Sequence, residues 1–450
     1  MIYIKWTTTQ EIDEIYFPIN FPGIEMPSSS KIKLQFGLWE KELTVQFSED
    51  LAGDQIGLSE NLREEVLIPD DLLYKINITE DSLCLGPVIL YVVSKRMLKR
   101  LGRIKKRFKH LDSINGLIIV CTVSGINIEE NTIKGYYLQP KTNKKKSNWK
   151  EGIFQYPEAV FKRKGLPRKI NNHLYKVTNG QVFNSIYFDK WEMWQWLSPN
   201  EFIRNHLPHT VKLKNLAEIY KMIDIYPSIY LKPKGGSQGK GIIEIKREDD
   251  LYQITDDKNR ATMVEYNNIG SHKSIKRVLE IRKKYLIQQG VPVKHDSRNV
   301  DFRIYMQKDE TKQWKCTGFI TRFAKPESIT TNLQHLDYLL PGKEALVKLF
   351  EKTPHDVKLL ERNIVNVCVE ACKILDENGC YGDLAVDFIL DNDLHVWILE
   401  MNKKYGYRSF SIIKDPKLYG RVIRNPFLYA SALAGFSSNN EPEKIEKGLE

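Results

Sequence analysis

The chain contains 450 residues, of which 42% are hydrophobic and 28% are charged. This composition is typical of a globular protein with several apolar cores, and it excludes intrinsic disorder for most of the chain. The 68 Lys and Arg residues exceed the 57 Asp and Glu residues, so the net charge is +11. Such an excess suits phosphate-bearing ligands or acidic partners, but it does not by itself indicate a nucleic-acid-binding protein. The length corresponds to about three domains.

The cellular location is constrained by hydropathy and by the cysteines. The longest apolar run, near residues 85–93, is shorter than the roughly 18 to 20 residues that a membrane-spanning helix needs. The first five residues lack the charged-then-apolar order of a secretion signal. The six cysteines follow no disulfide or metal-ligand pattern, and we interpret Cys368 and Cys372 as buried core residues. We therefore expect a cytoplasmic protein with reduced thiols and no membrane span.

The first part of the chain has strand periodicity. Apolar residues alternate with polar ones over residues 31–47, around Gly37, which predicts a two-stranded hairpin. We expect residues 1–80 to form a small, mostly β domain that holds no recognisable chemistry.

A strongly basic segment follows. Apolar runs at residues 88–93 and 116–123 flank residues 95–109, where nine of fifteen residues are Lys or Arg and apolar residues recur at helical spacing. The pattern predicts a β-α-β unit with a basic amphipathic helix, in an α/β domain at residues 81–205. A solvated helix face is the simpler interpretation of the charges, and a surface for an anionic partner is the alternative.

A lysine and a glycine-rich loop stand between two apolar runs within residues 228–245. Lys232 ends the first run, and the glycine-rich loop at residues 235–241 precedes the second. Glycines let backbone N–H groups approach a polyphosphate, and Lys232 can place its ammonium on a phosphate. The loop is no Walker A motif, because Lys240 is followed by Gly241 rather than by Ser or Thr. A glycine hairpin without a ligand is the alternative.

The next candidate nucleotide contact is a bend. The apolar run at residues 285–287 continues into Gln288, Gln289, Gly290 and Val291. Such a bend can offer backbone groups to an adenine edge and a side chain to a ribose. Taken alone the signal is weak, and an ordinary turn after a strand is the alternative.

Two arginines stand on predicted strands downstream. Asp301 and Arg303 share one face of a strand, and Arg322 ends another. Guanidinium groups match phosphate and carboxylate geometry, so both arginines are candidates to bind such anions. Structural Asp–Arg pairing is the alternative.

The strongest signal is a predicted hairpin that carries oxygen ligands. Asp387 lies inside an apolar run, turn residues follow at 391–393, and a second run ends in Glu400, Met401 and Asn402. Alternation places Glu400 and Asn402 on one face, and folding of the hairpin brings Asp387 close to them. Buried carboxylates repel one another unless cations lie between them, so the set predicts two Mg²⁺ ions that bridge a nucleotide triphosphate. Asp383 is a weaker alternative ligand, and solvated acids at strand ends are the simpler interpretation.

The order of these segments resembles the ATP-grasp superfamily, and within it the YheC/YheD-like group, described as endospore coat-associated proteins. The resemblance covers about residues 150–430 and rests on the segments 286–292, 301–303, 318–322, 331–333 and 399–402. It implies an α+β fold in which two subdomains at residues 206–436 clamp ATP. A pre-ATP-grasp domain at residues 81–205 would precede them, and we expect residues 437–450 to form a disordered tail.

The resemblance also implies roles for individual residues. Lys232 and Arg303 would act in catalysis, and Asp387, Glu400 and Asn402 would hold Mg²⁺. The residues expected to contact ATP are Lys232, Lys234, Gly235, Gly236, Ser237, Gln238, Gly239, Gly241, Gln288, Gln289, Val291, Arg322 and Asn332. Tyr405 stands where ATP-grasp ligases usually have proline, so we expect a different loop beyond the metal site, with Arg408 as a candidate to hold an acceptor anion.

The activity implied is that of an ATP- and Mg²⁺-dependent carboxylate–amine ligase acting through an acylphosphate. Its substrates would be small-molecule or peptide carboxylates and amines. The alternative is a non-catalytic, ATP-binding scaffold protein of the spore coat, with coat proteins as partners and segment 95–109 as an attachment surface. Either would lie in the cytoplasm or at the spore coat, and nucleic acid is not an expected partner.

Overall fold

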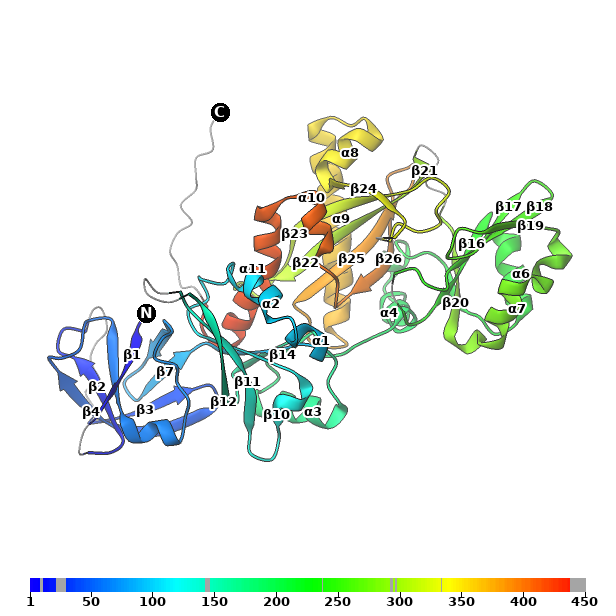
Figure 1. Cartoon of the computed structure of the whole chain (residues 1–450). Helices are drawn as coiled ribbons and strands as arrows, with labels where there is room; N and C mark the ends of the chain where they lie inside the picture. Colours follow the sequence, from blue (N-terminus) through cyan, green and yellow to red (C-terminus); the bar gives the residue numbers. More distant parts are fainter. Residues whose placement is uncertain are drawn as a thin grey trace. The chain divides into compact units, whose positions relative to one another are not determined.

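The computed structural model describes residues 1–8, 11–21, 30–141, 146–236, 238–291, 294–295, 298–332 and 334–437 (Figure 1). The chain divides into two compact units. Unit 1 comprises residues 1–185, 308–313 and 420–450, and unit 2 comprises residues 186–307 and 314–419. The domain boundaries predicted near residues 80, 205 and 436 stay predictions. Apart from Ser437, the predicted tail lies outside the described residues.

Unit 1 begins with a mixed sheet in the strand order β1-β5-β2-β4-β3-β7-β6. The strands are β1 (Tyr3–Thr7), β2 (Glu14–Pro18), β3 (Lys31–Phe36), β4 (Trp39–Ser48), β5 (Gln55–Ser59), β6 (Lys75–Ile78) and β7 (Ser82–Gly86). Strands β3 and β4 pair antiparallel around Gly37, whose φ of 62° is a conformation that glycine adopts without strain. The hairpin predicted at residues 31–47 is therefore confirmed.

The second sheet of unit 1 has the order β10-β11-β9-β8-β13-β14, and β12 pairs with β11. Its strands are β8 (Val88–Val92), β9 (Leu117–Cys121), β10 (Ile126–Asn127), β11 (Thr132–Gln139), β12 (Asn148–Gln155), β13 (Ala159–Lys162) and β14 (Val182–Phe183). Strands β8 and β9 are parallel, so the predicted β-α-β unit is confirmed. Helix α3 (Arg168–Val177) precedes β14, and apolar side chains of both sheets share one core.

The single helix predicted over residues 95–109 is wrong. The segment forms two helices, α1 (Lys95–Leu98) and α2 (Leu101–Phe108), because the chain leaves helical geometry at Arg100, with φ −123° and ψ 48°. Gly102 follows at once and is a poor helix former. Ile104 and Phe108 are buried on the inner face of α2, as the apolar spacing indicated.

Unit 2 contains an antiparallel sheet in the order β15-β20-β16-β17-β18-β19. Its strands are β15 (Thr210–Lys212), β16 (Ser228–Pro233), β17 (Ile243–Glu248), β18 (Leu251–Thr255), β19 (Ala261–Val264) and β20 (Tyr285–Gln289). Helices α6 (Leu216–Ile225) and α7 (Lys273–Glu280) contribute Ile219, Ile223 and Ile275 to its core. The predicted strand–loop–strand around the glycines corresponds to β16 and β17.

The other sheet of unit 2 has the order β24-β23-β22-β25-β26, with β21 paired to β22. Its strands are β21 (Lys294–His295), β22 (Arg298–Lys308), β23 (Trp314–Ala324), β24 (Leu336–Pro341), β25 (Asp383–Leu390) and β26 (Val396–Asn402). The accompanying helices are α4 (Lys190–Leu197), α5 (Glu201–Arg204), α8 (Gly342–Phe350), α9 (Pro354–Asp376) and α10 (Arg408–Ile413); α11 (Pro416–Leu433) leads back into unit 1. The expected mixed α+β class is confirmed.

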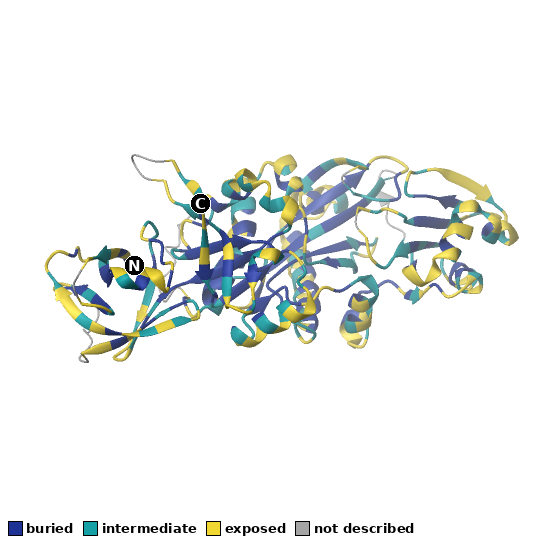
Figure 2. Cartoon of the chain, turned by 60° about the horizontal axis from the view of Figure 1, so that its bottom comes forward, coloured by how far each residue is buried: buried dark blue, intermediate teal, exposed yellow. Residues whose placement is uncertain are grey.

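Helix α9 packs on one face of this second sheet, where Ile364 and Cys368 share a core with Phe302 and Val386. Thr353 caps its first turn by accepting a hydrogen bond from the backbone N–H of Asp356. Cys368 and Cys372 are fully buried in its core, which confirms the structural interpretation of these cysteines. Figure 2 shows buried residues concentrated along the strands and exposed ones in loops and on outer helix faces. No helix within the described ranges is both long and apolar enough to cross a membrane.

Candidate functional site

A cavity of about 420 Å³ is lined by residues of both sheets of unit 2. Twelve of the residues predicted to form the site line it: Lys232, Gln238, Gly239, Gln288, Gln289, Val291, Arg303, Arg322, Asn332, Asp387, Glu400 and Asn402. They come from segments up to 170 residues apart in sequence. The structure therefore brings together the predicted phosphate loop, the bend, the arginines and the predicted metal ligands.

Part of the glycine-rich loop is not among the lining residues. Lys234, Gly235, Gly236 and Gly241 do not line the cavity, and Ser237 lies outside the described residues. The backbone N–H of Gly241 donates to Asp257 at 2.7 Å. A Cβ on Gly235 or Gly236 would meet no atom within 4 Å, so this stretch has open space around it. The loop thus contacts the cavity through Gln238 and Gly239.

Lys232 projects from the end of β16 and is held by its neighbour on β20. Its ammonium donates to Oε1 of Gln288 at 2.5 Å, and the Gln288 amide donates in turn to the Thr210 hydroxyl at 3.0 Å. Burial, assisted by the nearby Lys190, lowers the pKa of Lys232 to about 8. The side chain of Gln288 therefore orients the lysine, which leaves the backbone of the bend as the part that can meet a base.

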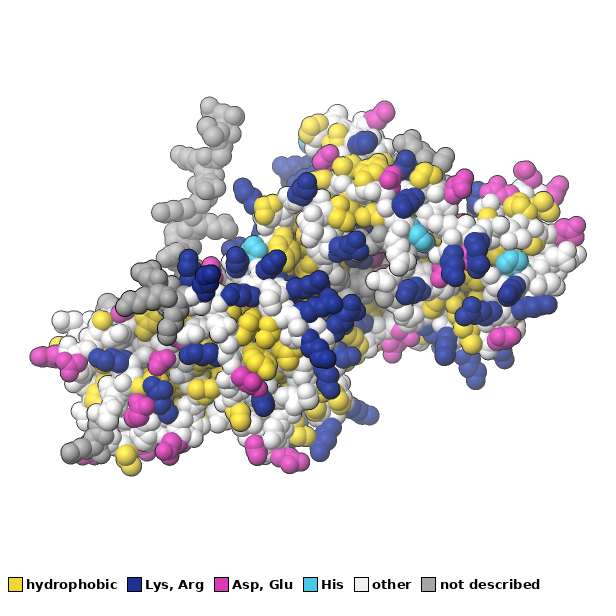
Figure 3. Space-filling model, in the orientation of Figure 1, with side chains coloured by type: hydrophobic (Ala, Val, Ile, Leu, Met, Phe, Trp, Pro, Cys, Tyr) yellow, Lys and Arg dark blue, Asp and Glu magenta, His cyan; other side chains and the backbone are white. Residues whose placement is uncertain are grey.

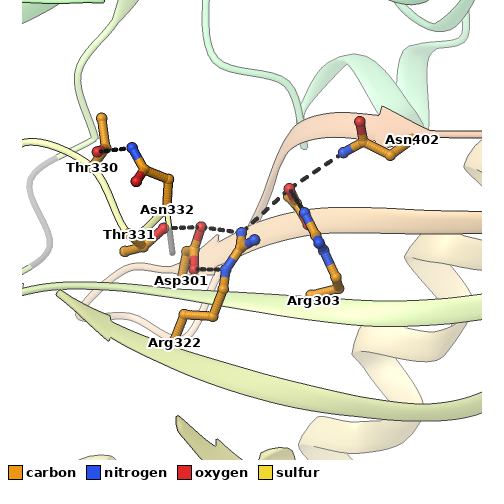
Figure 4. Close-up of polar contacts among 8 residues, drawn as sticks. Asp301, Arg303, Arg322, Thr330, Thr331, Asn332 and Asn402 are labelled. Carbon is orange, nitrogen blue, oxygen red and sulfur yellow. Dashed lines mark hydrogen bonds and ion pairs between the residues drawn. The ribbon is translucent and has the colours of Figure 1, made fainter. Parts of the chain in front are cut away.

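Two arginine–aspartate pairs form the floor of the cavity. Arg303 donates to both carboxylate oxygens of Asp387 at 2.7 Å, and Arg322 donates from Nε to Asp301 at 2.6 Å. Arg322 also lies 3.3 Å from Asp387, so the two pairs are linked. Figure 4 shows Arg322 beside Asp301, with Thr331 on one side and Arg303 and Asn402 on the other. The pairing foreseen as the structural alternative is present, and these residues also line the cavity.

The linked pairs affect the two carboxylates differently. Burial would raise the pKa of Asp387, but Arg303 and Arg322 together hold it below the ordinary value. Burial raises the pKa of Asp301 in spite of Arg322 and of the hydrogen bond from Thr331. The two arginines therefore favour the ionised form of Asp387.

The predicted metal ligands meet as the hairpin spacing required. Strands β25 and β26 pair Asp387 opposite Glu400, and the Asn402 amide lies 3.4 Å from Asp387. Glu400 forms an ion pair with Lys190 at 3.1 Å. Two carboxylates and an amide oxygen are hard donors that fit Mg²⁺. Within the described ranges, no group of three or more His, Cys, Asp or Glu side chains is placed to hold a metal ion. The set formed by Asp387, Glu400 and Asn402 is of a different kind, because its third donor is an asparagine.

Asp383 was the alternative ligand, and the structure places it elsewhere. It is fully buried and accepts hydrogen bonds from the Tyr405 hydroxyl at 2.5 Å and from Gln307 at 2.8 Å. Gln307 also accepts from Thr317 at 2.7 Å. Asp383 therefore belongs to a buried hydrogen-bond network and does not line the cavity.

Several lining residues were not identified from the sequence. Lys190 is the first residue of α4 and stands 210 positions before its partner Glu400, so no sequence spacing relates the two. The contact of Asn332, itself a predicted residue, was also not foreseen: its amide donates to the backbone carbonyl of Gln238 at 2.8 Å and joins the glycine-rich loop to the segment after β23. Ile242, Ile389 and Leu399 supply the cavity with apolar surface.

Comparison with known proteins gives related sequences and structures. A model described as YheC/D like ATP-grasp matches residues 179–433. The endospore coat-associated protein YheD of Bacillus subtilis (strain 168) is 26% identical over 84% of this chain and 85% of YheD. YheC of the same organism is 27% identical over 58% of this chain and 65% of YheC. The solved structure of the VanG D-Ala:D-Ser ligase from Enterococcus faecalis is 12% identical, with a TM-score of 0.46 over 76% of this chain and 99% of that one. The family match confirms the resemblance carried by the sequence motifs.

Proposed function

Because the chain belongs to the YheC/D-like ATP-grasp family, we propose that it is an ATP- and Mg²⁺-dependent ligase that joins a carboxylate to an amine. The observation that best supports this is the cavity of unit 2. Strand β16 and the loop after it contribute the half-buried Lys232, Gln238 and Gly239 to its lining, and the β25–β26 hairpin contributes Asp387, Glu400 and Asn402. Cations for phosphate oxygens and oxygen donors for a metal therefore face one space.

ATP occupies this cavity in the proposed complex. Lys232 and Lys190 bind phosphate oxygens, and Gln238 and Gly239 close over them with the backbone of the loop. The bend at residues 288–291 meets the base, and Ile242, Ile389 and Leu399 cover its faces. Mg²⁺, held by Asp387, Glu400 and Asn402, supplies positive charge that offsets the charge of the phosphates.

The reaction has two steps. A carboxylate oxygen of the donor attacks the γ-phosphorus of ATP, the bond from that phosphorus to the bridging oxygen breaks, and ADP leaves with the electron pair. The amine nitrogen of the acceptor then attacks the acyl carbon, phosphate leaves, and the nitrogen loses a proton to solvent. No side chain serves as nucleophile, which agrees with the absence of Cys and His from the described lining of the cavity.

Arg303 stabilises the phosphoryl group in transit. Its guanidinium is fixed by two hydrogen bonds to Asp387, so it is already oriented before substrates bind. Such pre-organised charge is the main contribution that a protein makes to phosphoryl transfer. Arg408 is exposed, lines the cavity and forms no ion pair with a described residue, and it holds an anionic group of the acceptor.

A second candidate function is a non-catalytic, ATP-binding scaffold of the spore coat. The observation that favours it is the description of both relatives as endospore coat-associated proteins. A scaffold would bind Mg-ATP in the same cavity without turning it over. Turnover, and not binding, therefore separates the two functions.

The experiment that tests the ligase is ADP release from ATP with a panel of amino acids and peptides. Wild type is compared with Glu400→Gln and with Asp393→Asn, an exposed acid in the turn of the same hairpin. We expect Glu400→Gln to reduce the rate by about 10² to 10³, by analogy with other charge-stabilising groups, and Asp393→Asn to keep it. If wild type binds Mg-ATP but releases no more ADP than Glu400→Gln with any substrate, the ligase function is refuted and the scaffold function is supported.

A further inference from the structure

A strongly basic surface of unit 1 lies on α1 and α2. We call it the basic surface and define it by seven exposed residues: Lys95, Arg96, Lys99, Arg100, Arg103, Lys106 and Lys109. Residues 95–109 contain no Asp or Glu. None of the seven forms an ion pair with a described residue. Figure 3 shows Lys and Arg side chains gathered on the face that carries these helices.

The helix that carries much of the basic surface is packed against the core of unit 1. Ile104 and Phe108 are buried beneath α2, and the ring of Phe108 contacts Trp149 of β12 and Phe427 of α11 at centroid distances of 5.3 and 6.0 Å. The apolar side of α2 is therefore packed against the interior of unit 1. The cations are held outward with no countercharge of their own, and clustered like charges repel unless an anion lies against them.

The composition of the surface indicates what kind of anion fits. Met97, Leu98 and Leu101 are half-exposed between the cations, so the surface mixes positive charge with apolar side chains. Residues 95–109 contain no Asn or Gln, the side chains that pair with adenine, and the one aromatic residue, Phe108, is buried and cannot stack on a base. A lipid headgroup layer offers phosphates above an apolar region, and it matches both features.

We propose that the basic surface of unit 1 docks the protein on an anionic lipid bilayer. The contact is peripheral: the cations meet headgroup phosphates, and Met97, Leu98 and Leu101 lie against the boundary of the acyl region. Each basic residue near such a surface contributes a factor of roughly five in affinity, and clusters of four to eight are typical of proteins that bind acidic lipids. The inference concerns unit 1 alone and does not depend on the activity proposed for unit 2.

The test is co-sedimentation of the full chain with vesicles of phosphatidylcholine alone or of phosphatidylcholine mixed with phosphatidylglycerol. Wild type should bind the acidic vesicles only, with an affinity that falls as salt rises. The triple variant Lys99→Gln, Arg103→Gln, Lys106→Gln should bind them roughly 100-fold more weakly. Since these three side chains are exposed, the variant should keep the wild-type melting temperature.

The matched control removes the same number of lysines and arginines from another exposed helix. Lys273→Gln, Lys276→Gln, Arg277→Gln in α7 should retain most of the binding. The proposal is overturned if wild type does not sediment with acidic vesicles, or if the control loses as much affinity as the α1–α2 variant. It is also overturned if wild type binds duplex DNA more tightly than acidic vesicles at the same salt and the α1–α2 variant loses that binding, which would make this a nucleic-acid surface.

Discussion

The hydroxyl of Tyr405 donates a hydrogen bond to the carboxylate of Asp383, with 2.5 Å between the two oxygens. Both side chains are buried, and the Gln307 amide donates to both of them. Tyr405 stands where the ATP-grasp pattern usually has proline, and it directly follows the segment that carries Glu400 and Asn402. The phenol therefore ties the loop beyond the proposed metal site to β25, where a proline could form no such bond.

Removal of this hydroxyl should destabilise unit 2. Tyr405→Phe leaves a buried carboxylate short of one donor, which costs about 1 to 3 kcal/mol. We predict a loss of this size in the free energy of unfolding, measured by urea denaturation. Tyr338→Phe is the control, because the ring of Tyr338 packs on Phe323 while its hydroxyl makes no hydrogen bond to a described residue. Equal stabilities for the two variants would show that the Asp383 contact contributes little.

The lowered pKa of Lys232 predicts that this residue reduces the stability of the fold while it strengthens the binding of ATP. Its value of about 8, against an ordinary 10.5, means that the unfolded state holds this proton more tightly than the folded state. Burial of the charged lysine therefore lowers the free energy of unfolding. The loss is complete below pH 8, shrinks between pH 8 and 10.5, and is absent above pH 10.5, where the lysine is neutral in both states. We predict that Lys232→Met raises the melting temperature more at pH 7 than at pH 10. It should weaken ATP binding at least about tenfold, because a charge-assisted hydrogen bond is lost.

Calorimetric titration with Mg-ATP and thermal unfolding at the two pH values measure these effects. Lys221→Met, which removes an exposed lysine of α6, should change neither. A melting temperature below that of wild type at pH 7 would contradict the destabilising role assigned to Lys232.

The sequence predicted those parts of the site that depend on local spacing. The alternation of apolar residues and the turn residues between the two runs predicted that Asp387, Glu400 and Asn402 lie close together. Strand periodicity and a short turn determine which side chains of a hairpin meet. Lys190 could not be assigned, since only tertiary packing places α4 beside β26. The break at Arg100 was missed because apolar periodicity is insensitive to a single pair of dihedral angles. Asp383 was misjudged because its partners Tyr405 and Gln307 are distant in the sequence.

Substitutions in the two linked arginine–aspartate pairs can show which carboxylate is a metal ligand and which has only a structural role. Asp387 and Asp301 are both buried and bound by arginines, so replacing either by Asn leaves a buried guanidinium without its countercharge and should cost about 3 kcal/mol. Only Asp387 faces Glu400 and Asn402. We predict that Asp387→Asn abolishes the dependence of ATP affinity on Mg²⁺, whereas Asp301→Asn preserves it. Calorimetric titrations with ATP, in Mg²⁺ and in EDTA, measure the difference. An equal response of the two variants to Mg²⁺ would assign Asp387 to Arg303 alone and remove it from the metal site.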